Sequence, residues 1–167
     1  MLDKFVLFIY FSDIIILGRN DYIMRIGLTS DHRGYRAKEF LKDSLYMHDV
    51  IDYGTDTEAS VDFPEYAKKL GIAINNDEVD LGIAICGTGI GMSIVLNKMK
   101  GIYCAKVSNV SEATLCRAHN NANAIALSEE LPEEVMLEIV NKFIETPFSN
   151  VSKYVRRNNM IKEIEND

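Results

Sequence analysis

Residues 81–102 read LGIAICGTGIGMSIVLNKMKGI, and this stretch decides the fold. It begins with the continuous apolar run Leu81–Ile85, which is typical of a strand buried on both faces of a parallel sheet. A glycine-rich turn follows, and the apolar spacing of Met92–Met99 fits a helix. A buried strand, a tight turn and a helix in this order form the repeating unit of parallel α/β sheets.

Further apolar runs on either side of this stretch have the same character, and segments with helical spacing alternate with them. The predicted strands are Arg25–Thr29, Val50–Tyr53, Leu81–Ile85, Ile102–Val107 and Ala124–Leu127. The predicted helices include Ala37–Leu45, Tyr66–Ile74, Met92–Met99, Val110–His119, one that opens at Pro132, and a last one around Val151–Ile164. We therefore expect an α/β fold with a doubly wound, mainly parallel five-stranded sheet and helices on both faces, a Rossmann-like three-layer sandwich. Sites in such folds lie at the carboxyl ends of the strands.

Composition limits the function classes that the chain can serve. The chain has 167 residues, 47% of them hydrophobic, which is enough for one domain with its own core. The net charge of −7 and the pI near 5.0 argue against a broad basic surface for nucleic acid or anionic lipid. The three cysteines (Cys86, Cys104 and Cys116) cannot all pair and lack metal-site spacing, so we expect reduced thiols, no metal and a cytoplasmic protein.

The first 23 residues differ from the rest of the chain. The apolar run Phe5–Leu17 contains Asp13 and is shorter than the ~20 residues that a membrane-spanning helix needs. It also lacks the basic start and the small-residue cleavage site of a signal peptide. Met24 stands directly before the first predicted strand. We therefore expect residues 1–23 to be an extension, residues 24–167 to be the working domain, and the protein to have no membrane partner.

Two predicted strands end in residues that carry chemistry. The first strand leads into Ser30–Gly34 (SDHRG), where an acid and an imidazole stand side by side and could handle a proton or a hydroxyl group. Alternatively, Ser30 or Asp31 simply caps the next helix. The third strand leads into Cys86–Gly91 (CGTGIG), whose alternating glycines leave backbone N–H groups open to an anion. This spacing matches neither a P-loop nor a full GxGxxG motif, and a thiol before open amides favours catalysis over a structural turn.

Two further polar segments are candidates for the site. The segment Arg117–Asn123 (RAHNNAN) leads into the fifth strand, and we expect His119 to reach the same sheet edge as Cys86. Alternatively, His119 is a structural residue. The main basic cluster consists of Lys153, Arg156 and Arg157, which form either a solvated helix face or a grip on a phosphate group.

Five segments together resemble the ribose-5-phosphate isomerase B family, whose wider group contains the galactose-6-phosphate isomerase subunits. They are SDHRGYRAK (30–38), VIDYGT (50–55), VDFPEYA (61–67), residues 79–102 and HNNANAIAL (119–127). The resemblance runs in order from about Met24 to the final helix. It implies interconversion of ribose 5-phosphate and ribulose 5-phosphate through a cis-enediolate, in the non-oxidative branch of the pentose phosphate pathway. It implies no metal and no organic cofactor.

The resemblance also implies roles for particular residues. Cys86 corresponds to the base that takes the C2 proton, and His119 to the residue that opens the sugar ring. The Thr88 hydroxyl and the amides of its loop correspond to the groups that hold the enediolate oxygen. Substrate contacts are implied for Asp31, His32, Gly87, Gly89, Ile90, Gly91, Asn120, Lys153 and Arg157.

The chain departs from the family pattern at two places. Family members that use ribose 5-phosphate commonly have an arginine eleven places after the ring-opening histidine, where this chain has Glu130. Lys153 stands where another arginine is usual, so it keeps the charge but loses the bidentate fork. Arg156 or Arg33 could compensate. Two alternatives follow: an isomerase of a six-carbon sugar phosphate such as galactose 6-phosphate, or a non-catalytic sugar-phosphate-binding module.

The resemblance also implies that the protein forms oligomers. The family builds each site between two subunits, with the last helix of one chain reaching over the glycine-rich loop of its partner. We therefore expect a homodimer or a dimer of dimers with shared sites.

Overall fold

The sheet of this protein is entirely parallel. The computed structural model describes residues 23–166, so the predicted extension, apart from its last residue, lies outside the described residues. The strands are β1 (Arg25–Ser30), β2 (Asp49–Asp52), β3 (Leu81–Cys86), β4 (Cys104–Lys106) and β5 (Ala124–Ser128). They lie in the order β2-β1-β3-β5-β4 with every pairing parallel, which confirms the predicted sheet. The central strand β3 is buried along its whole length.

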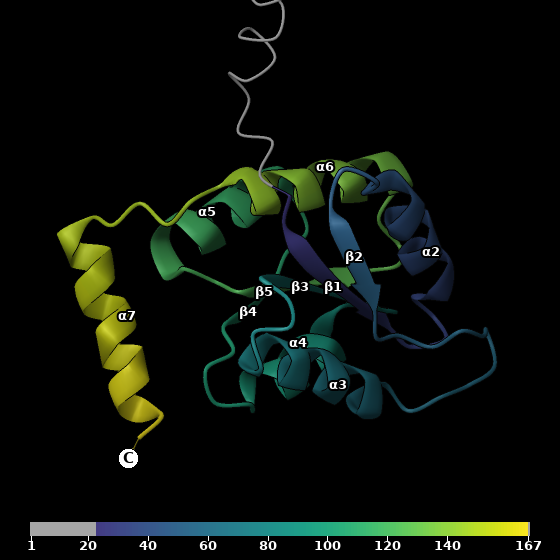
Figure 1. Cartoon of the computed structure of the whole chain (residues 1–167), viewed down its shortest axis with the longest axis horizontal. Helices are drawn as coiled ribbons and strands as arrows, with labels where there is room; N and C mark the ends of the chain where they lie inside the picture. Colours follow the sequence, from purple (N-terminus) through teal and green to yellow (C-terminus); the bar gives the residue numbers. More distant parts are fainter. Residues whose placement is uncertain (1–22, 167) are drawn as a thin grey trace, which may run out of the picture.

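Helices cover both faces of the sheet, as predicted (Figure 1). The described residues form α2 (Tyr35–Ser44), α3 (Phe63–Asn75), α4 (Ile90–Asn97), α5 (Val110–Asn120), α6 (Glu133–Glu145) and α7 (Ser152–Ile164). One core contains buried side chains of α2, α5 and α6, and the other contains those of α3 and α4. The predicted and observed elements correspond one to one. Their ends differ by up to three residues, and β4 is shorter than Ile102–Val107 because this edge strand pairs only with Ala124–Ala126 of β5.

Helix α7 stands apart from the rest of the fold (Figure 1). Asn158 is its one buried residue, and its amide donates to the carbonyl oxygen of His119 at 2.9 Å. Several of the apolar side chains on and beside this helix are exposed: Val151, Met160, Ile161 and Ile164. Over the described part of the chain, no helix has the length and apolar character to cross a membrane.

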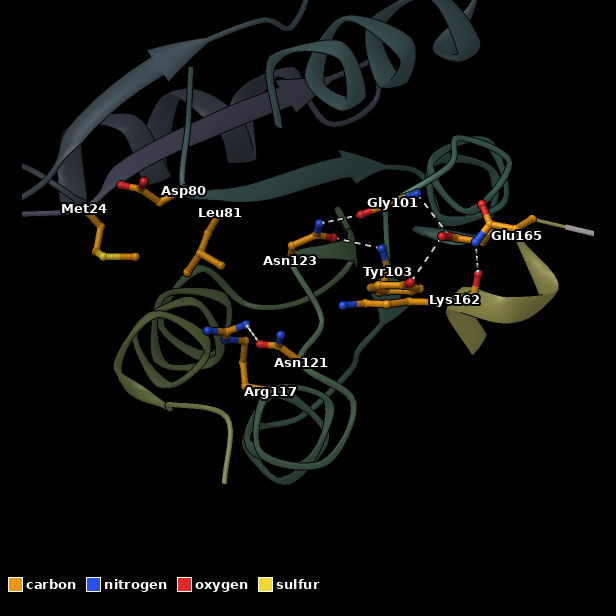
Figure 2. A pocket seen from close by; sticks show the side chains of 11 residues that line it. Met24, Asp80, Leu81, Gly101, Tyr103, Arg117, Asn121, Asn123, Lys162 and Glu165 are labelled. Atoms are coloured by element: carbon orange, nitrogen blue, oxygen red, sulfur yellow. Dashed lines mark hydrogen bonds between the residues drawn. The ribbon is translucent and has the colours of Figure 1, made fainter. Parts of the chain in front are cut away.

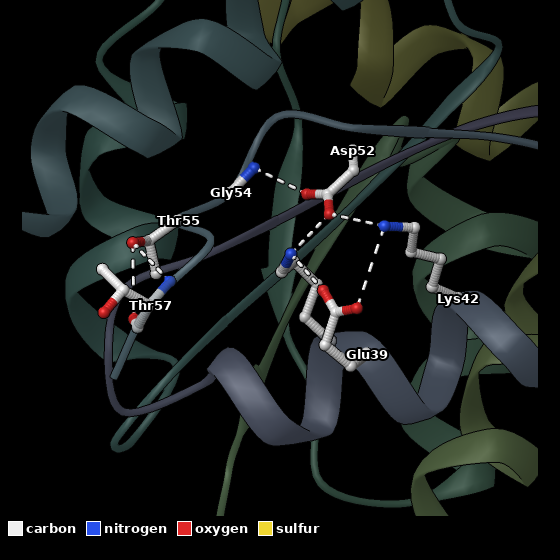
Figure 3. Close-up of polar contacts among 7 residues, drawn as sticks. Glu39, Lys42, Asp52, Gly54, Thr55 and Thr57 are labelled. Carbon is white, nitrogen blue, oxygen red and sulfur yellow. Dashed lines mark hydrogen bonds and ion pairs between the residues drawn. The ribbon is translucent and has the colours of Figure 1, made fainter. Parts of the chain in front are cut away.

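A buried lysine ties α2 to the end of β2. The side chain of Lys38 is 1% exposed, and its ammonium group pairs with Asp52 and, at 2.6 Å, with Glu39. Burial alone would lower the pKa of Lys38, but hydrogen bonds to the two carboxylates outweigh it and raise the pKa. Asp52 also accepts the N–H of Gly54 at 2.9 Å, so the ion pair fixes the start of the loop after β2 (Figure 3).

We predict that Lys38→Met lowers the free energy of unfolding by about 2 kcal/mol or more, because the partly buried carboxylate of Asp52 loses its buried ammonium partner. Lys42→Met is the matched control, since Lys42 lies 3.3 Å from the same Asp52 carboxylate but its side chain is 42% exposed. It should cost less than about 1 kcal/mol. Urea titration of both variants tests this, and equal losses would contradict it.

Candidate active site

Cys86 is the last residue of β3, at the carboxyl edge of the sheet where sites of this fold are expected. The N–H of Gly89 donates to the sulfur of Cys86 at 3.2 Å. Gly89 has a φ of 77°, and a Cβ at this position would lie 3.0 Å from the carbonyl carbon of Leu127. Only glycine fits this turn without strain, and the turn is what aims an amide at the thiol.

The loop Gly87–Gly91, which we call the Cys86 loop together with Cys86, exposes groups that can bind an anion. Among the described residues, the N–H groups of Gly87 and Thr88 have no hydrogen-bond partner. Thr88 Oγ1 accepts the N–H of Ile90 at 3.3 Å, so its own hydroxyl proton remains free to donate. Gly91 is required for packing rather than for anion binding, because a Cβ there would lie 2.9 Å from the ring of Phe63.

Asp31 and His32 follow β1 and lie at the same edge. The buried Asp31 accepts the N–H groups of Arg33 and Gly34 through Oδ1, at 2.9 and 3.1 Å. It therefore organises the turn before α2, although the residue that caps the helix is Gly34. His32 Nδ1 accepts the N–H of Val61 at 3.2 Å, which leaves Nε2 for a ligand.

The prediction that His119 reaches the edge that holds Cys86 is wrong for a single chain. His119 lies at the end of α5, which returns along the sheet and precedes the first residue of β5. Cys86 pairs in register with Ser128, the last residue of that strand. Five residues of strand span about 16 Å, so the two groups lie at opposite edges of the sheet.

His119 and Asn120 end α5, and His119 contacts Tyr154 of α7; we call these residues, with Lys153 and Arg157 of the same helix, the His119 cluster. The rings of His119 and Tyr154 stack with centroids 4.0 Å apart and planes 18° apart. Lys153 Nζ lies 4.7 Å from the centroid of Tyr154, while Asn120 and Arg157 are exposed. One chain thus presents a thiol with open amides at one edge of the sheet and an imidazole near basic side chains at the other, and we call them the two candidate half-sites.

The other two cysteines are poor candidates for a base. All three thiols are free and buried, as predicted for reduced cysteines. Burial raises the pKa of Cys104 to about 12 and that of Cys116 to about 11. In residues 23–166 no three His, Cys, Asp or Glu side chains gather as a metal site would require.

A pocket of about 510 Å³ lies at the amino edge of the sheet (Figure 2). Its lining residues are Met24, Asp80, Leu81, Gly101, Tyr103, Arg117, Asn121, Asn123, Lys162, Glu165 and Asn166. Several of its polar groups bond one another: Asn123 joins Gly101 and Tyr103 at 2.8 Å each, and Arg117 donates to Asn121 at 3.2 Å. Arg117, Asn121 and Asn123 of the candidate segment line this pocket, but no residue to which the resemblance gives a role does, so we do not assign the active site to it.

Comparison with known proteins decides the family. The family model described as Ribose/Galactose Isomerase matches residues 26–161, which include both half-sites. This chain belongs to the ribose/galactose isomerase family. The resemblance drawn from the sequence is confirmed, and the chain is an isomerase of this family.

Individual members of the ribose/galactose isomerase family agree with this assignment. Ribose-5-phosphate isomerase B of Escherichia coli is 36% identical over 123 residues, covering 72% of this chain and 80% of that protein. The ribose-5-phosphate isomerase B structure from Clostridium thermocellum has a TM-score of 0.83 and 39% identity, covering 86% and 98% of the two chains. The enzyme from Mycoplasma genitalium with bound ribulose-5-phosphate has a TM-score of 0.80 and 32% identity, covering 86% and 97%.

The structure adds residues that the sequence did not indicate. Tyr154 stacks on His119 from another helix, and no pattern in the sequence signals a contact of this kind. The Ser128 hydroxyl donates to the carbonyl oxygen of Gly87 at 2.7 Å and so braces the Cys86 loop. Glu130, the departure from the family pattern, is exposed rather than buried beside the loop.

We predict that two glycines of the loop respond differently to alanine. Gly89→Ala should cost about 1–3 kcal/mol of unfolding free energy, because its positive φ is strained for a residue with a Cβ. Gly87→Ala should stay within about 0.5 kcal/mol of wild type, because open space surrounds that position. Urea titrations measure both, and a tolerated Gly89→Ala would contradict the account of the turn.

Proposed function

We propose that this isomerase interconverts ribose 5-phosphate and ribulose 5-phosphate through a cis-enediolate, with Cys86 as the base. The observation that carries the proposal is the Gly89 N–H aimed at the sulfur of Cys86 at 3.2 Å, beside amides with no partner in the described chain. A thiol and anion-binding donors are then within one loop. Membership of the isomerase family argues against the alternative of a non-catalytic binding module.

The proposed reaction needs only proton transfers. His119 opens the furanose by moving the proton of the C1 hydroxyl to the ring oxygen, while the bond between C1 and the ring oxygen breaks and the C1 aldehyde forms. The Cys86 thiolate takes the C2 proton of the open aldose, and the electron pair of that bond forms the C1–C2 double bond of the enediolate. The same proton returns to C1, while the proton on O2 moves to O1, which leaves a ketone at C2. The Thr88 hydroxyl and the open amides hold the developing negative oxygen in place.

The other residues that we propose to contact the substrate lie in the two half-sites. We assign substrate contacts to Asp31, His32, Gly87, Gly89, Ile90 and Gly91 on the carboxyl edge, and to Asn120, Lys153 and Arg157 in the His119 cluster. No organic cofactor or metal takes part in these proton transfers. We place the reaction in the cytoplasm, in the non-oxidative branch of the pentose phosphate pathway.

We further propose that each site combines the Cys86 loop of one chain with the His119 cluster of a partner. The separation of the two half-sites by a strand length supports this arrangement. Exposed apolar side chains are present on both elements that would meet: Ile90 and Ile94 on α4, and Met160 and Ile161 on α7. A homodimer, or a dimer of dimers, would bury them.

A second candidate substrate is a six-carbon sugar phosphate such as galactose 6-phosphate. The observation that favours it is Glu130, a carboxylate at a position where users of ribose 5-phosphate commonly carry a cation. Activity of this single chain on the five-carbon substrate distinguishes the two candidates.

We predict that Cys86→Ala abolishes conversion of ribose 5-phosphate to ketose, because the variant lacks the proposed base. The matched control is Cys116→Ala, which removes a buried thiol remote from the loop and should keep turnover within about threefold of wild type. Ketose formation and melting temperature are measured on the same preparations. A folded Cys86→Ala variant with wild-type turnover would contradict the role of Cys86, and an inactive wild type would favour six-carbon substrates.

A further inference from the structure

An ion pair crosses the carboxyl end of β3 above the Cys86 loop. Arg33 follows β1 and Glu129 follows β5, and these two strands flank β3 in the sheet. Arg33 Nε donates to Glu129 Oε1 at 2.7 Å, and Nη2 donates to the same oxygen. The pair therefore bridges the two loops on either side of the strand end that carries Cys86.

Backbone hydrogen bonds anchor Glu129 to the Cys86 loop and Arg33 to its own turn after β1. The N–H of Glu129 donates to the carbonyl oxygen of Cys86 at 3.0 Å, and the N–H of Arg33 donates to Asp31 at 2.9 Å. A Cβ built on Gly87 would lie 4.0 Å from Arg33 Cγ, and apart from the chain neighbours of Gly87 no other atom of the described chain lies within that distance. The side chain of Arg33 therefore borders the open space next to Gly87.

The hydrogen-bonding capacity of Arg33 is only partly used. Glu129 occupies Nε and Nη2 through one oxygen, and within residues 23–166 Nη1 makes no hydrogen bond. Nη1 and the second N–H of Nη2 remain available to oxygen atoms of a ligand. Guanidinium groups suit phosphate because they offer several donors in one plane.

Charge balance at this edge makes Arg33 distinctive. Asp31, Glu129 and Glu130 are carboxylates on the same loops, and they repel a phosphate dianion. Three other cations of the described chain lie near this edge: Arg36 pairs with Glu58, Lys38 is buried against Asp52, and Lys106 at the end of β4 donates to Ser108. Among these described cations Arg33 is the one that lies against Gly87, so a phosphate that approaches the loop of this chain meets its remaining N–H donors.

We propose that Arg33 binds the phosphate group of the substrate and is a specificity-determining residue, with Glu129 holding its guanidinium over the Cys86 loop. The proposal rests on the proposed function, since it takes the substrate to be a sugar phosphate. Arg33 would then supply a positive charge on the carboxyl edge, where this chain has Glu130 in place of the arginine that is common in the family.

The test compares Arg33→Met with the matched control Arg36→Met. Both remove an exposed, ion-paired arginine from the same short stretch, but Arg36 pairs with Glu58 and not with Glu129. For Arg33→Met we expect KM for ribose 5-phosphate to rise about tenfold or more with kcat within about threefold, as for loss of a charge-assisted contact. Arg33→Lys should lie between wild type and Arg33→Met, and Arg36→Met should stay within about twofold of wild type.

Competition by inorganic phosphate identifies the group that Arg33 contacts. Its inhibition constant should rise in Arg33→Met by a factor similar to that of KM. A fall in kcat at unchanged KM, or equal effects of the two Met variants, would overturn the proposal. An inactive wild type would count against the proposed function alone. Calorimetric titration with inorganic phosphate would then test Arg33, and equal affinity of wild type and Arg33→Met would overturn its role.

Discussion

The parallel direction of all five strands is the constraint on which the rest of the structure depends. Parallel strands place all their carboxyl ends at one edge of the sheet and all their amino ends at the other. The Cys86 loop therefore lies at one edge, and a residue that precedes β5, such as His119, lies at the other. The fold places the two half-sites at opposite edges and prevents them from meeting within one chain, so oligomerisation becomes part of the proposed chemistry.

Much of the fold could be predicted because its signals are local. The buried strand β3 is a run of apolar residues, and α3 starts with a proline in its first turn, so each carries its own pattern. The glycine-rich turn after β3 likewise indicated an anion-binding loop. The ends of β4 were not predictable to the residue, because they depend on how far an edge strand pairs with β5.

The site was less predictable because it depends on contacts between distant segments. The edge on which His119 lies is set by the direction of α5, which ends just before β5 begins. The polar character of RAHNNAN does not contain that information, so the predicted edge was wrong. The stack of His119 on Tyr154 and the ion pair between Arg33 and Glu129 join residues far apart in the sequence. No periodicity records such pairs. Family resemblance supplied the roles of Cys86 and His119, whereas their spatial separation came from the topology.

The most direct test of a site shared between subunits mixes two inactive variants. Cys86→Ala and His119→Ala are purified separately, combined, partly unfolded and reassembled, and turnover of ribose 5-phosphate is then measured. In a mixed dimer one site contains both substitutions and the other contains none, so random reassembly should restore about a quarter of wild-type activity. Each variant reassembled alone should stay inactive. If the mixture is as inactive as its components although dimers have re-formed, both groups act within one chain, and the account is contradicted.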